Sequence, residues 1–182
     1  MKKIILSAIL CAIASYGFSQ TDEVRTRTNE IGLDIFDLAV FRTIDITYEY
    51  VKNADIGFGL TARYSFDANP DDLYMDTYEK YGITPFFRFY FLGKKTDYAS
   101  KKFYVESFLK FFGGENDDYY SYSRREIKNY FDIALGVGLG YKFVNRNGFV
   151  VDINFGIGRS FDISDYSPNL RERGGILIGY RF

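Results

Sequence analysis

The chain has no histidine, no tryptophan and only one cysteine among its 182 residues. Without histidine it lacks the usual base that activates a serine hydroxyl near neutral pH, so we expect no enzymatic activity and predict no catalytic residues. Cys11, the single cysteine, lies in an apolar stretch near the start, so the rest of the chain has neither disulfides nor thiol chemistry. The formal net charge of −1 is not that of a nucleic-acid-binding protein, and no nucleic-acid partner is expected.

Residues 1–19 have the order of features found in a secretory signal peptide. A basic start is followed by an apolar stretch and by small residues before a cleavage point at Gln20: Lys2 and Lys3, Ile4 to Ala14, then Gly17 and Ser19. The apolar stretch is too short to span a bilayer as a helix. Leu10, directly before Cys11, argues against lipid attachment to that cysteine. A buried N-terminal helix or strand is the alternative.

Beyond this segment the chain has no apolar run of about 18 residues, the length expected of a transmembrane helix. The mean hydropathy is −0.18, yet aromatic residues make up 20% of the chain, with 19 Phe and 17 Tyr. A β-barrel is the membrane architecture compatible with such an average, because only every second residue of its strands contacts lipid.

Apolar residues alternate with polar or small residues in eight segments, and this period of two indicates β-strands. The segments are 31–35, 44–50, 56–64, 83–91, 103–111, 131–142, 149–158 and 176–182. An even number of strands fits a single-chain bacterial barrel. We therefore predict an all-β fold, an eight-stranded antiparallel up-and-down transmembrane β-barrel over residues 29–182, preceded by the cleaved signal peptide and a short segment, residues 20–28.

The two faces of these segments differ in chemistry. One face carries large Ile, Leu, Val and Phe side chains, with Tyr near the ends, which suits lipid. The other face carries glycines and eleven charges: Asp34, Asp45, Glu49, Glu106, Asp132 and Asp152, with Arg63, Arg88, Lys110, Lys142 and Arg181. A soluble barrel with the same strands would expose the rings to water or bury these charges in an apolar core, and both are costly.

An interior of eight strands is just wide enough for side chains, so we predict that the inward charges form a packed network that closes the lumen. Its centre is expected at Glu49, Arg63, Arg88, Glu106 and Asp132. A polar conduction path is the alternative. The stretch Gly136-Val137-Gly138-Leu139-Gly140 does not have nucleotide-loop spacing, and its inward glycines are expected to leave room for Tyr90, Tyr104 or Phe108.

The predicted connections alternate in length. Two are short, at Val51–Asp55 and Val144–Asn147, and three are long and polar, at Ser65–Gly82, Gly113–Asn129 and Ser160–Arg173. Short periplasmic turns and long extracellular loops are typical of outer-membrane barrels, so both termini are expected in the periplasm. Two connections depart from the pattern: the short one near Ala39–Thr43 and the long basic one at Leu92–Lys102.

Acidic side chains crowd two of the long connections. They are Asp67, Asp71, Asp72, Asp76 and Glu79 in one, and Glu115, Asp117 and Asp118 in the next. Carboxylates can bind Ca²⁺, but EF-hand spacing is absent, so no metal site and no cofactor is predicted and calcium stays an alternative. Tyr119, Tyr120 and Tyr122 are suited either to a recognition surface or to the membrane interface.

The chain resembles the OmpX/OmpA-like small outer-membrane barrels, and more closely a group of uncharacterised outer-membrane barrel proteins. The resembling segments are Asn29-Glu30-Ile31 through Asp45-Ile46-Thr47-Tyr48-Glu49-Tyr50, Pro85-Phe86-Phe87-Arg88-Phe89-Tyr90-Phe91, Phe103-Tyr104-Val105-Glu106 and Gly136 to Lys142. The final residues, with Tyr180 and Phe182, resemble the C-terminal signal read by the barrel assembly machinery. The resemblance implies fold and location, in the outer membrane of a Gram-negative bacterium, and carries over no catalytic or ligand residues.

The expected function is a non-enzymatic one, either structural or as a surface-interaction module acting through the long extracellular loops. The expected partners are outer-membrane lipid, lipopolysaccharide and the assembly machinery, and the expected state is a monomer. A narrow pore for ions or small solutes is the first alternative. A soluble periplasmic ligand-binding β-barrel is the second.

Overall fold

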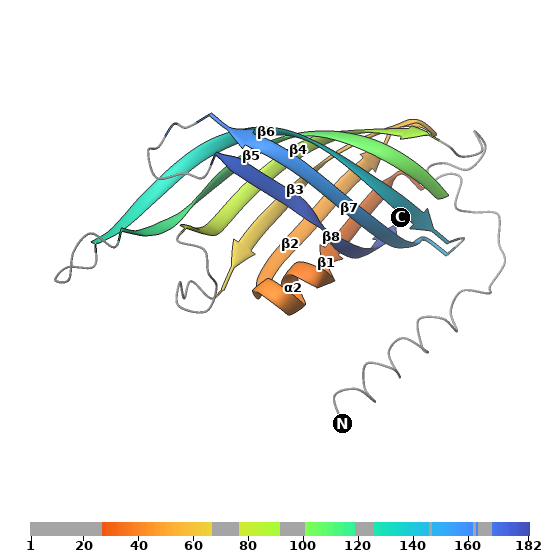
Figure 1. The fold of residues 1–182 in the computed structure, drawn as a ribbon. Coiled ribbons are helices and arrows are strands. Elements are labelled where there is room, and N and C mark those ends of the chain that lie inside the picture. Colours follow the sequence, from red (N-terminus) through yellow and green to blue (C-terminus); the bar gives the residue numbers. More distant parts are fainter. Residues whose placement is uncertain are drawn as a thin grey trace, which may run out of the picture.

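Eight antiparallel strands close into a barrel in which each strand pairs with its neighbour in sequence and the last pairs with the first (Figure 1). This computed structural model describes residues 27–66, 77–91, 101–118, 126–145, 147–161, 163 and 169–182. The predicted signal peptide, residues 1–19, lies outside the described residues. The predicted fold class, a closed eight-stranded antiparallel barrel, is confirmed.

One short helix interrupts the succession of strands. The elements are β1 Asn29–Asp34, α2 Ile35–Phe41, β2 Thr43–Val51, β3 Ile56–Ser65, β4 Thr77–Phe91, β5 Lys101–Asp118, β6 Glu126–Val144, β7 Phe149–Ser160 and β8 Leu170–Arg181. Among the described residues, no helix is long and apolar enough to cross a membrane.

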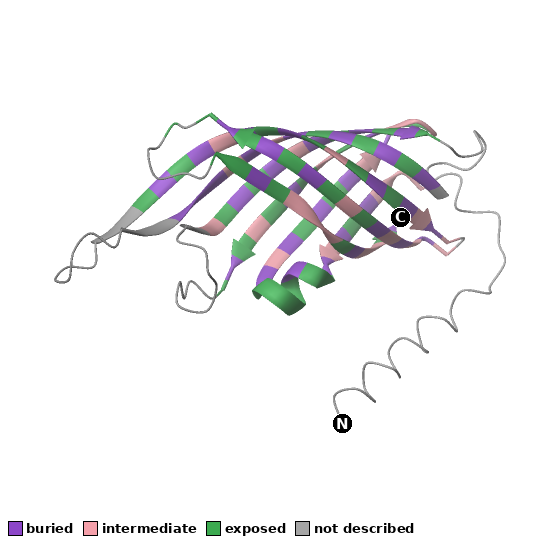
Figure 2. Cartoon of the chain, in the orientation of Figure 1, coloured by how far each residue is buried: buried purple, intermediate pink, exposed green. Residues whose placement is uncertain are grey.

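Burial alternates residue by residue along the strands, as Figure 2 shows. In β6, Leu139 is 64% exposed, whereas Asp132 and Ala134 are buried. Because successive side chains of a strand point to opposite faces, the closed sheet puts one set inside and the other on the outer surface. Most of the large apolar residues are on the outer surface and most of the charged residues of the strands are inside, which is the reverse of a soluble protein.

The ends of the strands differ from the sequence prediction. The connections expected at Ser65–Gly82, Gly113–Asn129 and Ser160–Arg173 were predicted too long, because β4 begins at Thr77, β5 and β6 extend to Asp118 and Glu126, and β8 begins at Leu170. Backbone pairing continues past the point where the alternation of side chains ends, since the ladder of hydrogen bonds does not depend on the side chains. Three acidic loop residues, Glu115, Asp117 and Asp118, are therefore strand residues. The residues between 67 and 76 and the tyrosines 119, 120 and 122 lie outside the described part.

Residue Ile35, predicted to end the first strand, instead begins α2. The carboxylate of Asp34 accepts hydrogen bonds from the backbone N–H groups of Phe36 and Asp37, at 2.9 and 3.0 Å. An acidic residue at this position satisfies the first free N–H groups of a helix, so the strand stops there. Arg42 ends the helix in the left-handed conformation, with φ 52°, and turns the chain into β2.

The two ends of the barrel have different connections. At one end lie the links after Val51 and Val144, each closed by an asparagine whose side-chain oxygen, in Asn53 or Asn145, accepts two backbone N–H groups. At the same end, Asn29 and Phe182 exchange backbone hydrogen bonds of 3.1 and 2.8 Å. We call this the turn end and the opposite one the α2 end.

Candidate functional site in the barrel lumen

Charged side chains fill the lumen in two groups. The first, nearer the turn end, is the turn-side cluster: Glu30, Glu49, Arg88, Glu106, Lys142, Asp152, Arg173 and Arg181. The second is the α2-side cluster: Asp37, Asp45, Arg63, Glu79, Lys110 and Arg171. Each cluster holds as many acidic as basic side chains, so each is neutral within the barrel.

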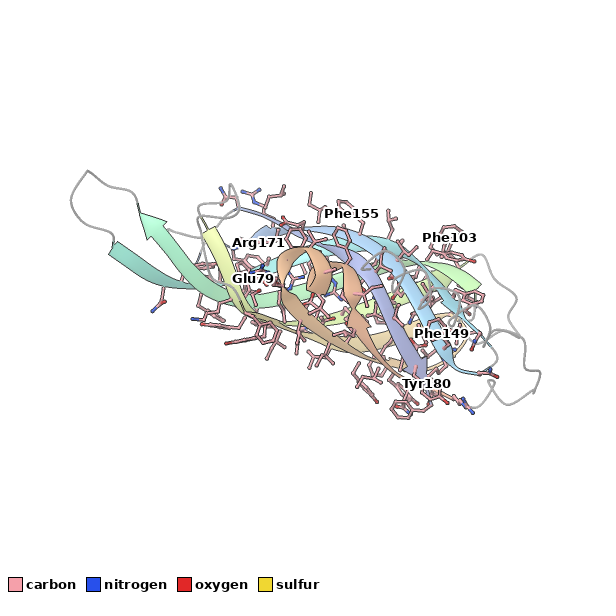
Figure 3. All side chains as sticks on the ribbon, turned by 90° about the horizontal axis from the view of Figure 1, so that it is seen from below. Glu79, Phe103, Phe149, Phe155, Arg171 and Tyr180 are labelled. Carbon is pink, nitrogen blue, oxygen red and sulfur yellow. The ribbon has the colours of Figure 1, made fainter. Side chains whose placement is uncertain are left out.

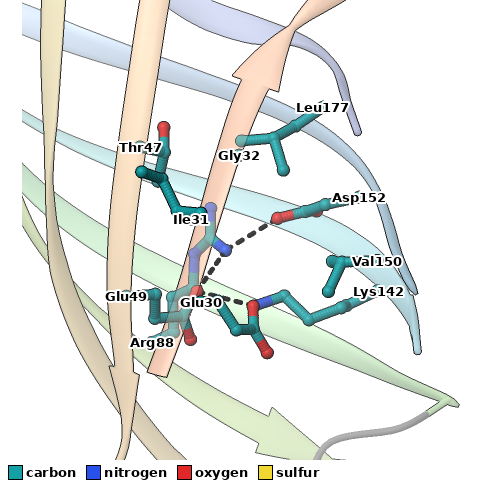
Figure 4. Close-up of a pocket in the computed structure, with 10 residues that line it drawn as sticks. All are labelled: Glu30, Ile31, Gly32, Thr47, Glu49, Arg88, Lys142, Val150, Asp152 and Leu177. Carbon is teal, nitrogen blue, oxygen red and sulfur yellow. Dashed lines mark hydrogen bonds and ion pairs between the residues drawn. The ribbon is translucent and has the colours of Figure 1, made fainter. Parts of the chain in front are cut away.

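Arg88 is the centre of the turn-side cluster, and its side chain is 1% exposed. Its Nε donates to Glu106 at 2.7 Å. Its Nη1 donates to Glu49 and to Asp152, both at 2.7 Å (Figure 4). The guanidinium carbon lies 4.3 Å from the ring centre of Tyr104. The planar guanidinium of Arg88 on β4 thus binds carboxylates from β2, β5 and β7. Of these three strands only β5 pairs with β4 in the sheet, so the ion pairs also link β4 to two strands that are not its neighbours.

Lys142 contacts two carboxylates of the cluster, of which Arg88 also contacts one. Its Nζ lies 2.6 Å from an oxygen of Glu30 and 2.6 Å from an oxygen of Glu49. Glu30 also pairs with Arg181. Buried charges are costly unless paired and hydrogen-bonded, and here every carboxylate of the cluster has a cation in contact.

Little space remains between these groups. The cavity of Figure 4 has a volume of about 10 Å³ and is bounded by Glu30, Glu49, Arg88, Lys142 and Asp152 among others. This is at the lower limit for holding a single water molecule. The part of the lumen around Arg88 and Lys142 is therefore filled by side chains.

The α2-side cluster is organised around Arg63 and Glu79 (Glu79 is labelled in Figure 3). Arg63 donates to both oxygens of Asp45, at 2.6 to 3.1 Å, and also contacts Asp37 of the helix. Glu79 binds Lys110 at 2.7 Å. Between the two clusters, the Oγ1 atoms of Thr47 and Thr61 are 2.9 Å apart, so polar contacts run along the lumen.

Inward glycines make room for large rings, as the sequence predicted. A Cβ placed on Gly136 would overlap the ring of Phe108 and lie 2.7 Å from the backbone oxygen of Ile157. A Cβ on Gly140 would overlap the ring of Tyr104. Gly136 and Gly140 of β6 pair with Phe108 and Tyr104 of β5, so the glycines leave space for these rings to lie over the neighbouring strand.

The five residues expected at the centre of the network lie in different places. Glu49, Arg88 and Glu106 are in direct contact in the turn-side cluster. Arg63 belongs to the α2-side cluster. Asp132 is fully buried, but one oxygen accepts the backbone N–H groups of Ile133 and Ile163, at 2.6 and 3.3 Å, and its other oxygen has no hydrogen-bond partner among the described residues. The lumen holds two clusters instead of one, and Asp132 has no cation beside it in the described part.

Some lumen charges were not predicted: Glu30, Asp37, Glu79, Lys102, Arg171 and Arg173. Glu30, Lys102, Arg171 and Arg173 continue the alternation of their strands, so longer predicted strands would have included them. Glu79 was wrongly placed in an acidic loop. A register shift between Glu79 and Tyr81 adds one residue to β4, and such a bulge reverses the side-chain parity and turns Glu79 inward.

The chemistry that the two clusters offer is ion pairing between fixed charges. The lumen carboxylates of the two clusters are engaged by arginine or lysine. Within the described residues, no group of three or more metal-ligating side chains lies close enough to hold a metal ion. The site is thus a set of fixed, mutually neutralised charges that occupy the barrel interior.

Comparison with known proteins gives matches at the level of structure. No protein-family model matches the chain, and no curated protein sequence matches it. The N-terminal β-barrel domain of Pseudomonas aeruginosa OprF is similar over 85% of this chain and 95% of that domain, with 12% identity and a TM-score of 0.52. Neisserial surface protein A matches over 85% and 93%, with 15% identity and a TM-score of 0.49, and the Yersinia pestis outer membrane protein Ail over 86% and 99%, with 15% identity and a TM-score of 0.44. The closed eight-stranded sheet and the match to the OprF domain show that the chain has the fold of the small outer-membrane barrels.

Proposed function

We propose that this protein is a non-enzymatic barrel of the outer membrane of a Gram-negative bacterium, with a closed lumen, and that it acts structurally or through the connections at its α2 end as a surface-interaction module. The observation that carries the proposal is the inverted distribution of side chains. Apolar side chains cover the outer surface of all the strands, including Ile46, Phe58, Ile83, Val105, Leu139, Phe155 and Ile176. An apolar surface that encircles the barrel suits lipid, and it is far larger than the patches of soluble monomers.

Exposed tyrosines support a membrane position at both edges of this apolar surface. Tyr64 and Tyr81 pair with one another near the α2 end, and Tyr48 and Tyr180 lie near the turn end. Aromatic side chains with a polar tip are enriched at the two membrane–water interfaces. A soluble ligand-binding barrel would carry the apolar set inside, where this barrel carries ion pairs.

The orientation that we propose places the turn end in the periplasm and the α2 end outside the cell. Two of the three turn-end links, residues 52–55 and 145–148, are shorter than the links at the α2 end, and this difference supports the orientation. The third turn-end link, residues 92–100, is the exception. In this orientation lipid and lipopolysaccharide surround the barrel, which acts as a monomer, and the final strand with Tyr180 and Phe182 is presented to the assembly machinery from the periplasm.

The packing of the lumen supports a plug in preference to a pore. Arg88 contacts three carboxylates, and the cavity beside it has about 10 Å³. Opening a path would require the separation of buried ion pairs, which is strongly unfavourable.

Fractionation of a Gram-negative host that expresses the full chain tests the proposal. We expect the protein in the outer-membrane fraction, released only by detergent. Unboiled and boiled samples should migrate differently in a denaturing gel, because a closed barrel stays folded in the detergent until it is heated. Recovery in the periplasmic extract without detergent, with the same mobility before and after boiling, would overturn the proposal.

A further inference from the structure

The wall of the barrel has a gap at the α2 end of β1. Strand β1 stops at Asp34, which pairs with Leu177 of β8, whereas its partners continue. Among the described strands, β8 over residues 170–176 therefore pairs with β7 alone, and β2 over residues 43–45 pairs with β3 alone. At the α2 end of the barrel, the sheet therefore lacks one strand between the edge of β8 and the edge of β2.

Helix α2 lies in this gap. It packs against β2 on one side and β8 on the other, and it is seen on the side of the barrel in Figure 3. One missing strand separates the two edges by twice the strand spacing, about 10 Å, and a helix with its side chains is about 10–12 Å across. The carboxylate of Asp34 also accepts the backbone N–H of Ile176 at 3.3 Å, which satisfies the first group of the β8 edge that β1 no longer covers.

The helix has its polar side inward and its apolar side outward. Asp37 is its only buried residue, 5% exposed, and it reaches Arg63 of the α2-side cluster through the wall. The large apolar residues of the helix are all exposed: Ile35, Phe36, Leu38, Val40 and Phe41. A surface helix of a soluble protein has the opposite arrangement, with its apolar stripe toward the core.

The apolar face of α2 is continuous with the apolar outer surface of the strands. Ile176 of β8 is exposed beside the gap, and Ile44 of β2, just after the helix, pairs with the interfacial Tyr64. The helix therefore lies at the depth of the aromatic edge, where an exposed apolar face meets the boundary between lipid headgroups and acyl chains.

We propose that α2 is a segment of the barrel wall that replaces a missing strand, held from inside by the Asp37–Arg63 ion pair and covered from outside by lipid acyl chains. The proposal rests on the membrane location proposed above. It adds a lateral contact between this one connection and the lipid of the outer leaflet, which the alternation of the strands did not predict.

The absence of tryptophan makes the test direct, since any introduced tryptophan is the only one in the protein. Val40→Trp places it on the outer face of α2, where Val40 is 52% exposed. Leu139→Trp reports the lipid-facing surface and Lys52→Trp the exposed turn between β2 and β3. Each variant is reconstituted in phosphatidylcholine vesicles with brominated or unmodified acyl chains, and its fluorescence is also measured with added iodide. Phe36→Trp, which exchanges one ring for another, provides a second α2 probe if Val40→Trp folds poorly.

We expect brominated lipid to quench Val40→Trp at least about half as strongly as Leu139→Trp, with little effect of iodide, because a face at the acyl boundary contacts the chains. Lys52→Trp should show the reverse. If Leu139→Trp is quenched but both α2 probes respond only to iodide, α2 faces water and the inference is wrong while the membrane location stands. Quenching of the α2 probes by neither agent would mean that protein, such as a second copy, covers the helix, and this also overturns the inference. If Leu139→Trp itself is not quenched by brominated lipid, the proposed membrane location and the inference fail together.

Discussion

Arg88 of β4 and Asp152 of β7 are 64 positions apart in the chain, and their side chains meet across the lumen with an Nη1–Oδ2 distance of 2.7 Å. Neither strand pairs with the other in the sheet. The ion pair therefore holds opposite parts of the wall together. Among the described ion pairs, it is the only one that Asp152 makes, whereas Glu49 and Glu106 each have a second cation.

Loss of the Arg88 cation should destabilise the barrel strongly. Arg88→Met keeps much of the volume but leaves Asp152 without a cation, and removing one partner of a buried pair costs about 3–5 kcal/mol. Urea unfolding of the protein in vesicles, followed by the shift in gel mobility, measures the change. Lys52→Ala, on the exposed turn, is the control and should stay within about 0.5 kcal/mol of the original chain. A loss below about 1 kcal/mol for Arg88→Met would show that the network contributes little to stability.

Removal of charge from the centre of the lumen should also open a leak. Arg88→Ala combined with Glu106→Ala deletes two large buried side chains and frees space beside the existing small cavity. We expect no current through planar bilayers with the original protein and irregular current steps with the double variant. Regular current steps with the original protein, with an ion selectivity that changes when Arg88 is replaced, would instead show that the protein is a natural pore.

Addition of one methyl group at Gly136 should strain the interior. The Cβ of Gly136→Ala would overlap the ring of Phe108 and approach the backbone oxygen of Ile157 to 2.7 Å, so we expect a loss of about 1–3 kcal/mol in unfolding free energy. Combination with Phe108→Leu should recover part of this loss, because the two changes share one space. Ala62→Leu, on the exposed outer face, is the control, and it should be tolerated. If Gly136→Ala is as stable as the original chain, the glycine is not needed for packing.

The architecture could be predicted from the sequence because successive side chains of each strand alternate between the lumen and the outer surface. Lys142 and Asp152 are inward because of their parity in alternating strands, and no tertiary information was needed to place them there. Which charges meet was not predictable in this way. Arg88 reaches Asp152 because of the tilt and stagger of the closed sheet, which the alternation of a single strand does not contain.

Two features of the α2 end were beyond the alternation rule for different physical reasons. Glu79 turns inward because a bulge shifts the parity of β4, and nothing in the local pattern marks the extra residue. The side chain of Asp37 reaches the lumen from α2, and the many apolar residues of this helix are also typical of a strand, so the helix was not predicted. The Asp34 cap is the local signal that a strand ends there, and it competes with the continuing apolar run.

The most direct test of the inverted barrel is the cost of one charge on its outer surface. Val137→Arg places a charge midway between the exposed Phe131 and Tyr141 of β6, and Tyr64→Arg places the same charge at the edge of the apolar outer surface. In vesicles, the free energy of unfolding should fall by about 2–4 kcal/mol for Val137→Arg and by about 0–1 kcal/mol for Tyr64→Arg, because the penalty depends on depth in the bilayer. If both variants unfold within about 0.5 kcal/mol of the original protein, as exposed positions of a soluble barrel would, the outer surface does not face lipid.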